Sequence, residues 1–214
     1  MYAIATMYND GFKEMASITL PNKEYYCSKH GYPLLVKTDN FSEGRHVYFD
    51  KNRFLLELLD KNPDIKWFWW LDCDAVITNH SIKFEQWCDD NFSFVITKDF
   101  NMMNNGSFFI QNTDASKNFL YRMLEKENKY INCPPYDNGA LTEVVEDSPE
   151  LLSLFKVCRQ RDFNSYFNFG CEKTRLDSMG NTSHWEPDDF VIHFAGPMDI
   201  KIPMIKYMRW FIKE

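Results

Sequence analysis

The sequence has little that would direct it to or across a membrane. It has no run of about 18 uncharged apolar residues, which excludes a transmembrane helix of ordinary length. Its first ten residues, MYAIATMYND, have no basic segment followed by a long apolar run, so they do not resemble a signal peptide. The six cysteines include no CxxC pair, which indicates reduced thiols in a cytosolic setting. We therefore expect a soluble, cytoplasmic protein.

Positive charge is also in short supply. The 24 lysines and arginines are outnumbered by 31 acidic residues, giving a net charge of −7 and a pI near 5.3. With no basic face evident, nucleic acid is not the expected partner. Hydrophobic residues make up 44% of the 214 positions and aromatic residues 17%, which is enough for a folded core. No repeat, low-complexity tract or flexible linker is present, so one domain over residues 1–214 is the simplest interpretation.

Strand-like and helix-like segments alternate along the first half of the chain. The predicted strands are 2–6, 32–38, 66–71, 92–97, 106–112 and 190–196. The predicted helices are 11–30 with a break at Pro21, 53–61 capped by Asn52, 114–128, 138–146, and a basic amphipathic helix over 201–214. This alternation predicts an α/β domain with a mostly parallel central sheet flanked by helices. Ligands of such sheets bind beyond the carboxyl ends of the strands.

Two acidic residues follow the most apolar strand. In KWFWWLDCDAVITN, residues 66–79, an uninterrupted apolar run from Trp67 to Leu71 leads directly to Asp72 and Asp74. The run is apolar on both faces, as expected of a central strand. Carboxylates two positions apart on an extended chain point to the same side, and a divalent cation would offset their repulsion. The pattern favours a hard ion such as Mg²⁺ or Mn²⁺, although an ordinary turn is the alternative.

Several segments together resemble one enzyme family. They are WWLDCDAVITN (69–79), NKEYYCSKHGYPLLV (22–36), FDKNRFLLELL (49–59), NNGSFFIQN (104–112), YDNGAL (136–141) and HFAG (193–196). In their order and spacing they resemble retaining glycosyltransferases of family 34, the galactosyltransferase and xyloglucan xylosyltransferase group. The compact form is also similar to glycosyltransferase domains encoded by large algal viruses. The resemblance implies a GT-A, Rossmann-like fold.

The resemblance also implies a metal and two substrates. Asp72, Asp74 and His193 would hold the ion, with Cys73 between the aspartates also close to the donor. Mn²⁺ suits two carboxylates and an imidazole, and Mg²⁺ is the alternative. The donor would be a UDP-sugar and the acceptor a glycan or glycoprotein. Donor contacts are expected from several further residues, which are Thr6, Tyr8, Lys51, Asn104, Asn105 and Lys201.

Asp137 and Asn138 are the catalytic candidates that the resemblance implies. Asp137 could attack the sugar as a nucleophile, or Asp137 and Asn138 could stabilise an oxocarbenium ion while the acceptor attacks from the leaving-group face. The sequence leaves both courses open. It departs from the family pattern at Asn138, where the family has Gln, and at Tyr136, where the family has an acid. Asp99 is a further candidate, either for a donor-sugar hydroxyl or as a loop cap.

Two other functional classes fit parts of the sequence. A non-catalytic module that binds a UDP-sugar or glycan would keep the fold without turnover. A D-x-D phosphohydrolase would carry its motif after the first strand and follow it with Thr, whereas here the motif comes late and is followed by Ala75. Family members are commonly anchored in the Golgi by an N-terminal span, whereas this chain begins directly with a strand. A soluble enzyme, in the host cytoplasm if viral, or one domain of a longer polypeptide is therefore expected.

Overall fold

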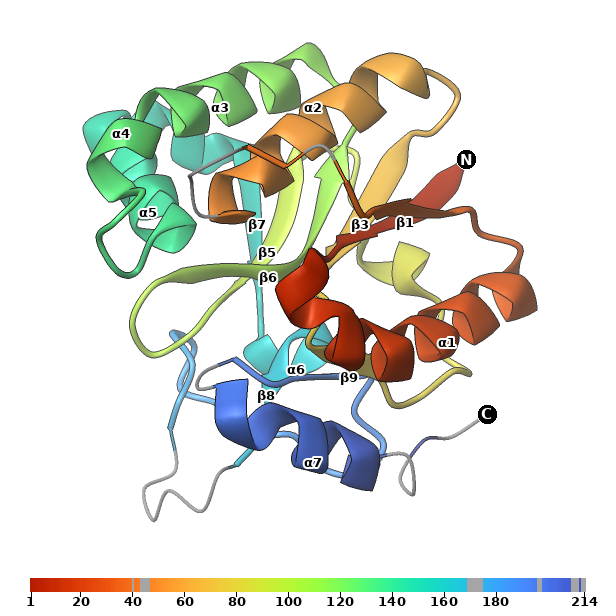
Figure 1. Ribbon diagram of the computed structural model, residues 1–214. Helices are drawn as coiled ribbons and strands as arrows, with labels where there is room; N and C mark the ends of the chain where they lie inside the picture. Colours follow the sequence, from red (N-terminus) through yellow and green to blue (C-terminus); the bar gives the residue numbers. More distant parts are fainter. Residues whose placement is uncertain (40, 43–46, 169–174, 196–197, 209–211, 213–214) are drawn as a thin grey trace.

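The computed structural model describes residues 1–39, 41–42, 47–168, 175–195, 198–208 and 212 (Figure 1). Its main feature is a six-stranded sheet with the order β2-β1-β3-β6-β5-β7. The strands are β1 (Tyr2–Met7), β2 (Leu34–Lys37), β3 (Trp67–Leu71), β5 (Phe94–Lys98), β6 (Met103–Gln111) and β7 (Phe155–Cys158). Only β6 runs antiparallel to its neighbours in this sheet. The predicted mostly parallel α/β sheet is therefore confirmed.

A second, three-stranded sheet lies below the first in Figure 1. It contains β4 (Ala75–Ile77), β9 (Val191–His193) and β8 (Ser165–Tyr166), in the order β4-β9-β8. The strand predicted over 190–196 is thus shorter than expected and belongs to a separate sheet, while residue 196 lies outside the described residues. Since β3 of the large sheet and β4 of the small sheet are joined by the D-x-D segment, this segment lies where the two sheets meet.

Helices cover both faces of the large sheet. One face carries α2 (Asp50–Lys61), α3 (Asp114–Glu125), α4 (Glu127–Tyr130) and α5 (Asp137–Asp147), and the other carries α1 (Lys13–His30) (Figure 1). The small sheet is flanked by α6 (Gln160–Phe163) and α7 (Met198–Met208). Short 3₁₀ helices occur at η1 (Asp10–Phe12), η2 (Val47–Phe49), η3 (Phe84–Trp87) and η4 (Pro149–Leu154).

Three predicted helix boundaries are wrong. The helix α1 continues through Pro21, because this residue and Ser17, whose carbonyl loses its usual donor, both lie on the exposed side. The helix α2 begins at Asp50, since η2 leads directly into it, so Asn52 lies inside the helix and does not cap it. The helix predicted over 114–128 divides at Lys126 into α3 and α4.

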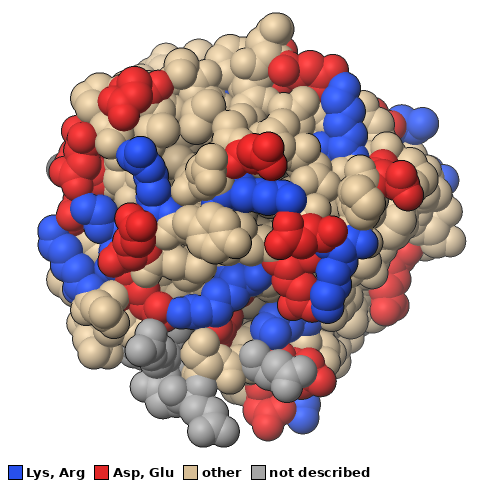
Figure 2. All heavy atoms as spheres, turned by 90° about the horizontal axis from the view of Figure 1, so that it is seen from above, with Lys and Arg blue, Asp and Glu red and all other residues tan. Residues whose placement is uncertain are grey.

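The C-terminal helix packs on the domain. Ile205 and Met208 of α7 join a buried cluster with Met15 and Ala16 of α1. The predicted range reached residue 214, but residues 209–211, 213 and 214 lie outside the described residues. No helix among the described residues is both long and apolar enough to cross a membrane. On the face shown in Figure 2, basic and acidic side chains are interspersed, and no continuous basic area is visible there.

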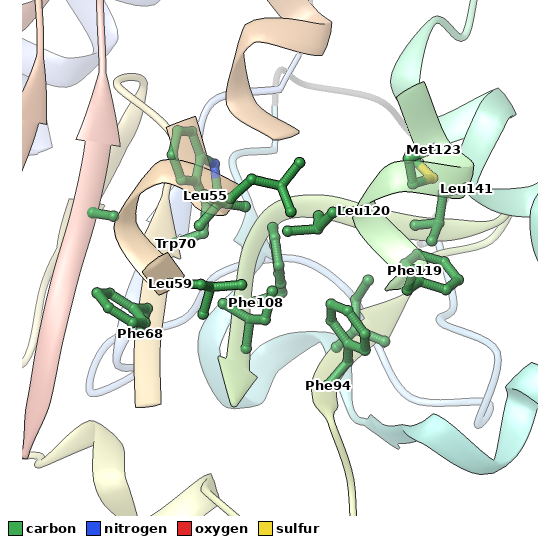
Figure 3. Close-up of a cluster of buried hydrophobic side chains, with 14 of the residues drawn as sticks. Leu55, Leu59, Phe68, Trp70, Phe94, Phe108, Phe119, Leu120, Met123 and Leu141 are labelled. Atoms are coloured by element: carbon green, nitrogen blue, oxygen red, sulfur yellow. The ribbon is translucent and has the colours of Figure 1, made fainter. Parts of the chain in front are cut away.

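All five residues of β3 are buried, and they point alternately to two cores. Phe68 and Trp70 pack under α2 and α3 with Leu55, Leu59 and other side chains drawn in Figure 3. Trp67 and Trp69 enter the core on the opposite face. Burying a large apolar side chain stabilises a fold by about 1.5–3 kcal/mol. The strand that leads to the two aspartates is therefore anchored on both sides.

Candidate active site

The D-x-D segment forms a tight turn. The strand β3 ends at Leu71, and the amide of Ala75 then donates to the carbonyl of Asp72 at 3.1 Å. The aspartates therefore do not lie on an extended strand, as the sequence had suggested, but on a turn that brings them together. One ligand atom each from Asp72, Asp74 and His193 lies within 4.8 Å of the other two. These three residues, distant in sequence, form a group that could hold a metal ion.

Asp72 is held from the side of the large sheet. The indole nitrogen of Trp70 donates to Asp72 Oδ1 at 2.6 Å, and Lys51 Nζ lies 3.3 Å from the same oxygen. The amide of Asp72 donates to the carbonyl of Gly106 at 2.8 Å. Burial raises the pKa of Asp72, and the nearby charge of Asp74 adds to the increase, while Lys51 opposes it. A cation at this position would favour the ionised form.

Asp74 is held from the side of the small sheet and α7. Lys201 Nζ donates to Asp74 Oδ2 at 2.5 Å, and His193 Nε2 lies 3.3 Å from Asp74 Oδ1. All three side chains are buried. Burial alone would raise the pKa of Asp74, but Lys201 and the protonated form of His193 outweigh it and hold the pKa below its usual range. Asp74 is therefore ionised at neutral pH.

A buried amide sets the orientation of His193. The side-chain nitrogen of Asn164 donates to Thr97 Oγ1 at 2.9 Å and to Asn104 Oδ1 at 3.0 Å. The oxygen of the same amide therefore faces His193 Nδ1, at 2.9 Å, and accepts a hydrogen bond from its N–H group. This leaves the Nε2 lone pair directed at a carboxylate oxygen of Asp74. Two acceptors face each other there, and a proton or a metal ion must lie between them.

A second cluster surrounds Lys51. Its ammonium lies 3.2 Å from Asp137 Oδ2 and donates to the backbone and side-chain oxygens of Asn105, both at 3.0 Å. Burial disfavours the charge of Lys51, but Asp137 and Asp72 outweigh this and raise its pKa. Asn105 also donates from its side chain to Asp137 at 2.9 Å and from its amide to Asn138 Oδ1 at 3.0 Å. Lys51 therefore connects the D-x-D turn to the start of α5.

Both clusters border one cavity of ≈180 Å³. Its lining includes Tyr8, Lys51, Asp72, Cys73, Asp74 and Lys201 of the predicted residues, together with Met7, Asn9, Phe12, Phe41, Val47 and Tyr48. Asn104, Asn105, Asp137, Asn138 and His193 are not among the residues that line it. Thr6 is buried within β1 and does not line the cavity. Asp99 accepts bonds from Tyr166 and from the amides of residues 101 and 102, as expected of a loop cap.

Several residues of the site were not identified from the sequence. Asn164 lies in a segment without a recognisable motif, and only the fold brings it to His193. Lys23 is fully buried in α1, where its ammonium donates to the carbonyls of Ala75 at 2.7 Å and Cys73 at 3.5 Å. It therefore supports the D-x-D turn from beneath. A charged residue on the buried side of a helix was the available signal, but the apolar pattern of α1 is too weak to reveal which side is buried.

Comparison with known sequences identifies the family. A profile of the galactosyl transferase GMA12/MNN10 family, glycosyltransferase family 34, matches residues 2–91 and 87–200. A probable α-1,6-mannosyltransferase, MNN10, from Saccharomyces cerevisiae is 26% identical over 84% of this chain and 54% of the relative. The chain spans roughly half to three-fifths of the length of the curated relatives it matches.

Comparison with solved structures confirms the fold. A glycosyltransferase involved in glycosylation of the major capsid of PBCV-1 aligns with a TM-score of 0.73 and 17% identity, covering 98% of each chain. The galactosyltransferase LgtC, solved in complex with donor and acceptor sugar analogues, aligns with a TM-score of 0.62 and 13% identity over 100% of this chain and 97% of that chain. The fold is that of GT-A glycosyltransferases, and the chain belongs to the galactosyl transferase GMA12/MNN10 family, glycosyltransferase family 34.

Proposed function

We propose that this protein is a metal-dependent, retaining glycosyltransferase. It would move a hexose, deoxyhexose or pentose from a UDP-sugar to a glycan or glycoprotein acceptor. The observation that carries the proposal is the convergence of Asp72, Asp74 and His193 within 4.8 Å, beside a cavity that two lysines border. Family membership and the GT-A fold support the transfer of a sugar, and the side chains of the site support the finer statement.

The donor atoms fit a divalent cation. Two carboxylates and an imidazole suit Mn²⁺, which accepts nitrogen more readily than Mg²⁺ does. The lone pairs of His193 Nε2 and Asp74 Oδ1 face each other at 3.3 Å, which a cation between them would relieve. A bound ion would supply Lewis-acid stabilisation to the diphosphate that leaves.

The lysines complete the charge balance of the donor site. Three carboxylates, Asp72, Asp74 and Asp137, are accompanied by Lys51 and Lys201. With these groups ionised, the cluster carries about one net negative charge, and a divalent cation would make it positive enough to attract a diphosphate. Both ammonium groups line the cavity, where Lys51 and Lys201 would contact phosphate oxygens. Tyr8 and Phe12 also line the cavity, and their rings would offer flat surfaces for a nucleobase.

Asp137 is the residue that we propose acts on the sugar. Its carboxylate is buried at the start of α5, where Lys51 and Asn105 fix its position. A fixed carboxylate beside an anomeric carbon can attack it as UDP leaves, forming a glycosyl-enzyme whose sugar the acceptor then takes in a second displacement that releases the carboxylate. Alternatively, it can stabilise positive charge on the ring while UDP leaves and the acceptor attacks from the same face. Both courses retain the anomeric configuration. Asn138 would help by holding Asn105, to which its side-chain oxygen is bonded.

The proposal is tested by incubating the protein with UDP-glucose, UDP-galactose, UDP-xylose and UDP-rhamnose, with Mn²⁺ or with EDTA. We expect slow release of UDP from one donor in Mn²⁺ and none in EDTA. The released sugar should initially have the same anomeric configuration as the donor. Tight UDP binding without hydrolysis or transfer for any donor would support a non-catalytic module instead. Release of phosphate from simple phosphomonoesters would support a phosphohydrolase.

A further inference from the structure

Two tyrosine rings stack at the edge of the proposed donor cavity. Tyr48, from η2, and Tyr136, immediately before α5, have ring centroids 4.4 Å apart and planes only 12° from parallel. Tyr48 is 37% exposed, and Tyr136 is half-buried. Segments nearly 90 residues apart in the sequence thus present an aromatic pair at the surface. We refer to Tyr48 and Tyr136 together as the tyrosine pair.

The tyrosine pair extends outward from the cavity. Tyr48 lines the cavity together with Lys51 and Asp72, whereas Tyr136 does not line it. Tyr136 directly precedes Asp137, whose carboxylate is bound to Lys51. A donor in the cavity would therefore have its diphosphate near Asp72 and its sugar near Asp137. A second substrate that approaches Asp137 from solvent would meet the tyrosine pair.

The backbone at Tyr136 gives an independent indication of function. Its φ is 56° and its ψ is −124°, a combination that glycine adopts readily and a residue with a side chain does not. Such a conformation is strained, and residues that carry this strain cluster at ligand-binding sites. Because the backbone alone would favour glycine here, the strain marks Tyr136 as a candidate for a functional role.

We propose that the tyrosine pair is the stacking surface for a pyranose ring of the acceptor glycan. This inference rests on the proposed function, since only a transferase has an acceptor. A pyranose has an apolar face of C–H groups that packs on an aromatic ring, while its hydroxyls remain at the edge. Tyrosine suits this ligand because its ring is flat and apolar and its phenol can hydrogen-bond a hydroxyl. The pair would hold the acceptor ring beside Asp137 without taking part in the chemistry.

The test compares Tyr136→Gly with Tyr136→Phe in the full chain. Saturation-transfer NMR would be recorded with Mn²⁺, UDP and millimolar methyl α-galactopyranoside, methyl α-mannopyranoside or methyl β-xylopyranoside. We expect at least one glycoside to receive saturation through its C–H face in the wild type and in Tyr136→Phe, and the signal to fall severalfold in Tyr136→Gly. With a glycoside that serves as acceptor, the ratio of transfer to donor hydrolysis should fall about tenfold in Tyr136→Gly only.

Thermal unfolding separates this role from a structural one. Tyr136→Gly relieves the strained backbone, so its midpoint should equal or exceed that of the wild type even as the glycoside signal falls. Loss of stability with an unchanged ratio of transfer to hydrolysis would overturn the inference, as would the absence of saturation of every glycoside in the wild type. A third outcome is that glycosides bind only when residue 136 has an aromatic ring, while no UDP-sugar is hydrolysed. In that case the proposed function fails, but the tyrosine pair remains a sugar-binding site.

Discussion

Gly106 and His193 are in direct contact: a Cβ atom built on Gly106 would lie 2.1 Å from His193 Cε1. No real Cβ atom makes so short a contact, so the imidazole occupies the space that only a glycine leaves free. The Asn-Asn-Gly segment therefore needs a glycine at position 106, because His193 of the small sheet occupies the space that a side chain would fill. Its absent side chain allows His193 to reach the D-x-D turn.

Gly106→Ala should displace His193 from Asp74. We expect the affinity for Mn²⁺, measured by electron paramagnetic resonance, to fall at least about tenfold, because one ligand moves away. Overpacking should also destabilise the fold by about 1–3 kcal/mol. Gly31→Ala is the matched control: it adds strain at a φ of 73° but has no neighbour within 4 Å. It should lose about 1 kcal/mol of stability and keep its Mn²⁺ affinity. Equal Mn²⁺ affinities in the two variants would refute this role of Gly106.

Asn164→Leu should weaken Mn²⁺ binding through His193. The variant removes the acceptor that keeps the proton on Nδ1, and losses of 10–100-fold are typical for such partners. Asn164→Asp, which still offers an acceptor, should recover part of the affinity. Tyr166→Phe breaks the bonds to Asp99 and Asn104 in the same network without touching the bond between Asn164 and His193. Tyr166→Phe should lower the stability of the fold and leave Mn²⁺ affinity unchanged. Weaker Mn²⁺ binding in Tyr166→Phe would show that affinity depends on the whole network, and not on the orientation of His193.

Asp137→Asn should abolish turnover while leaving UDP binding in place. The amide keeps the shape and can still accept from Asn105, but it loses the charge that would face the sugar under the proposed function. We expect kcat for donor hydrolysis to fall by roughly 10²–10⁴, and the Kd for UDP, which has no sugar, to be retained. Asp147→Asn at the other end of α5 removes an exposed carboxylate paired with Lys126 and should leave kcat unchanged. A normal kcat in Asp137→Asn would exclude a catalytic role for this residue.

His80 should make the fold less stable in mild acid. It is almost fully buried, and burial lowers its pKa to about 4 from an ordinary value of 6.5. Between these values the unfolded chain binds a proton that the folded protein does not. The contribution of neutral His80 to the free energy of unfolding is therefore fully present above pH 6.5. It falls as the pH drops to about 4, by at most about 3 kcal/mol. Urea unfolding of the wild type and of His80→Gln over this range should show a shallower pH dependence in the variant. Parallel curves would contradict the assignment to His80.

The sequence was most informative where a local pattern has only one outcome. The apolar run from Trp67 to Leu71 could hardly be anything but a central strand, and both its position and the mostly parallel sheet are as predicted. The family resemblance placed Asp72, Asp74 and His193 in one group, and the structure brings them together. Chain order alone would not have done so, because His193 belongs to a second sheet that the sequence did not predict.

The features of the fold and of the site that the sequence did not predict depend on contacts between distant segments. Asn164 orients His193, and Lys23 supports the D-x-D turn, yet neither belongs to a motif. The position of Pro21 suggested a break, but α1 continues because the proline faces solvent and packing holds the helix on either side. Tertiary packing, which a linear pattern does not encode, decided each of these features.

The most direct test of the central claim is calorimetric titration of UDP into the wild type and Asp74→Asn, each with Mn²⁺ and with EDTA. We expect the wild type to bind UDP at least about tenfold more tightly in Mn²⁺, because under the proposed function the ion would attract the diphosphate to the aspartates. Asp74→Asn should lose this difference while showing the same fold by circular dichroism. If UDP binds the wild type equally well in EDTA, or if Asp74→Asn keeps the full effect of Mn²⁺, then Asp72, Asp74 and His193 do not form the metal site of a glycosyltransferase.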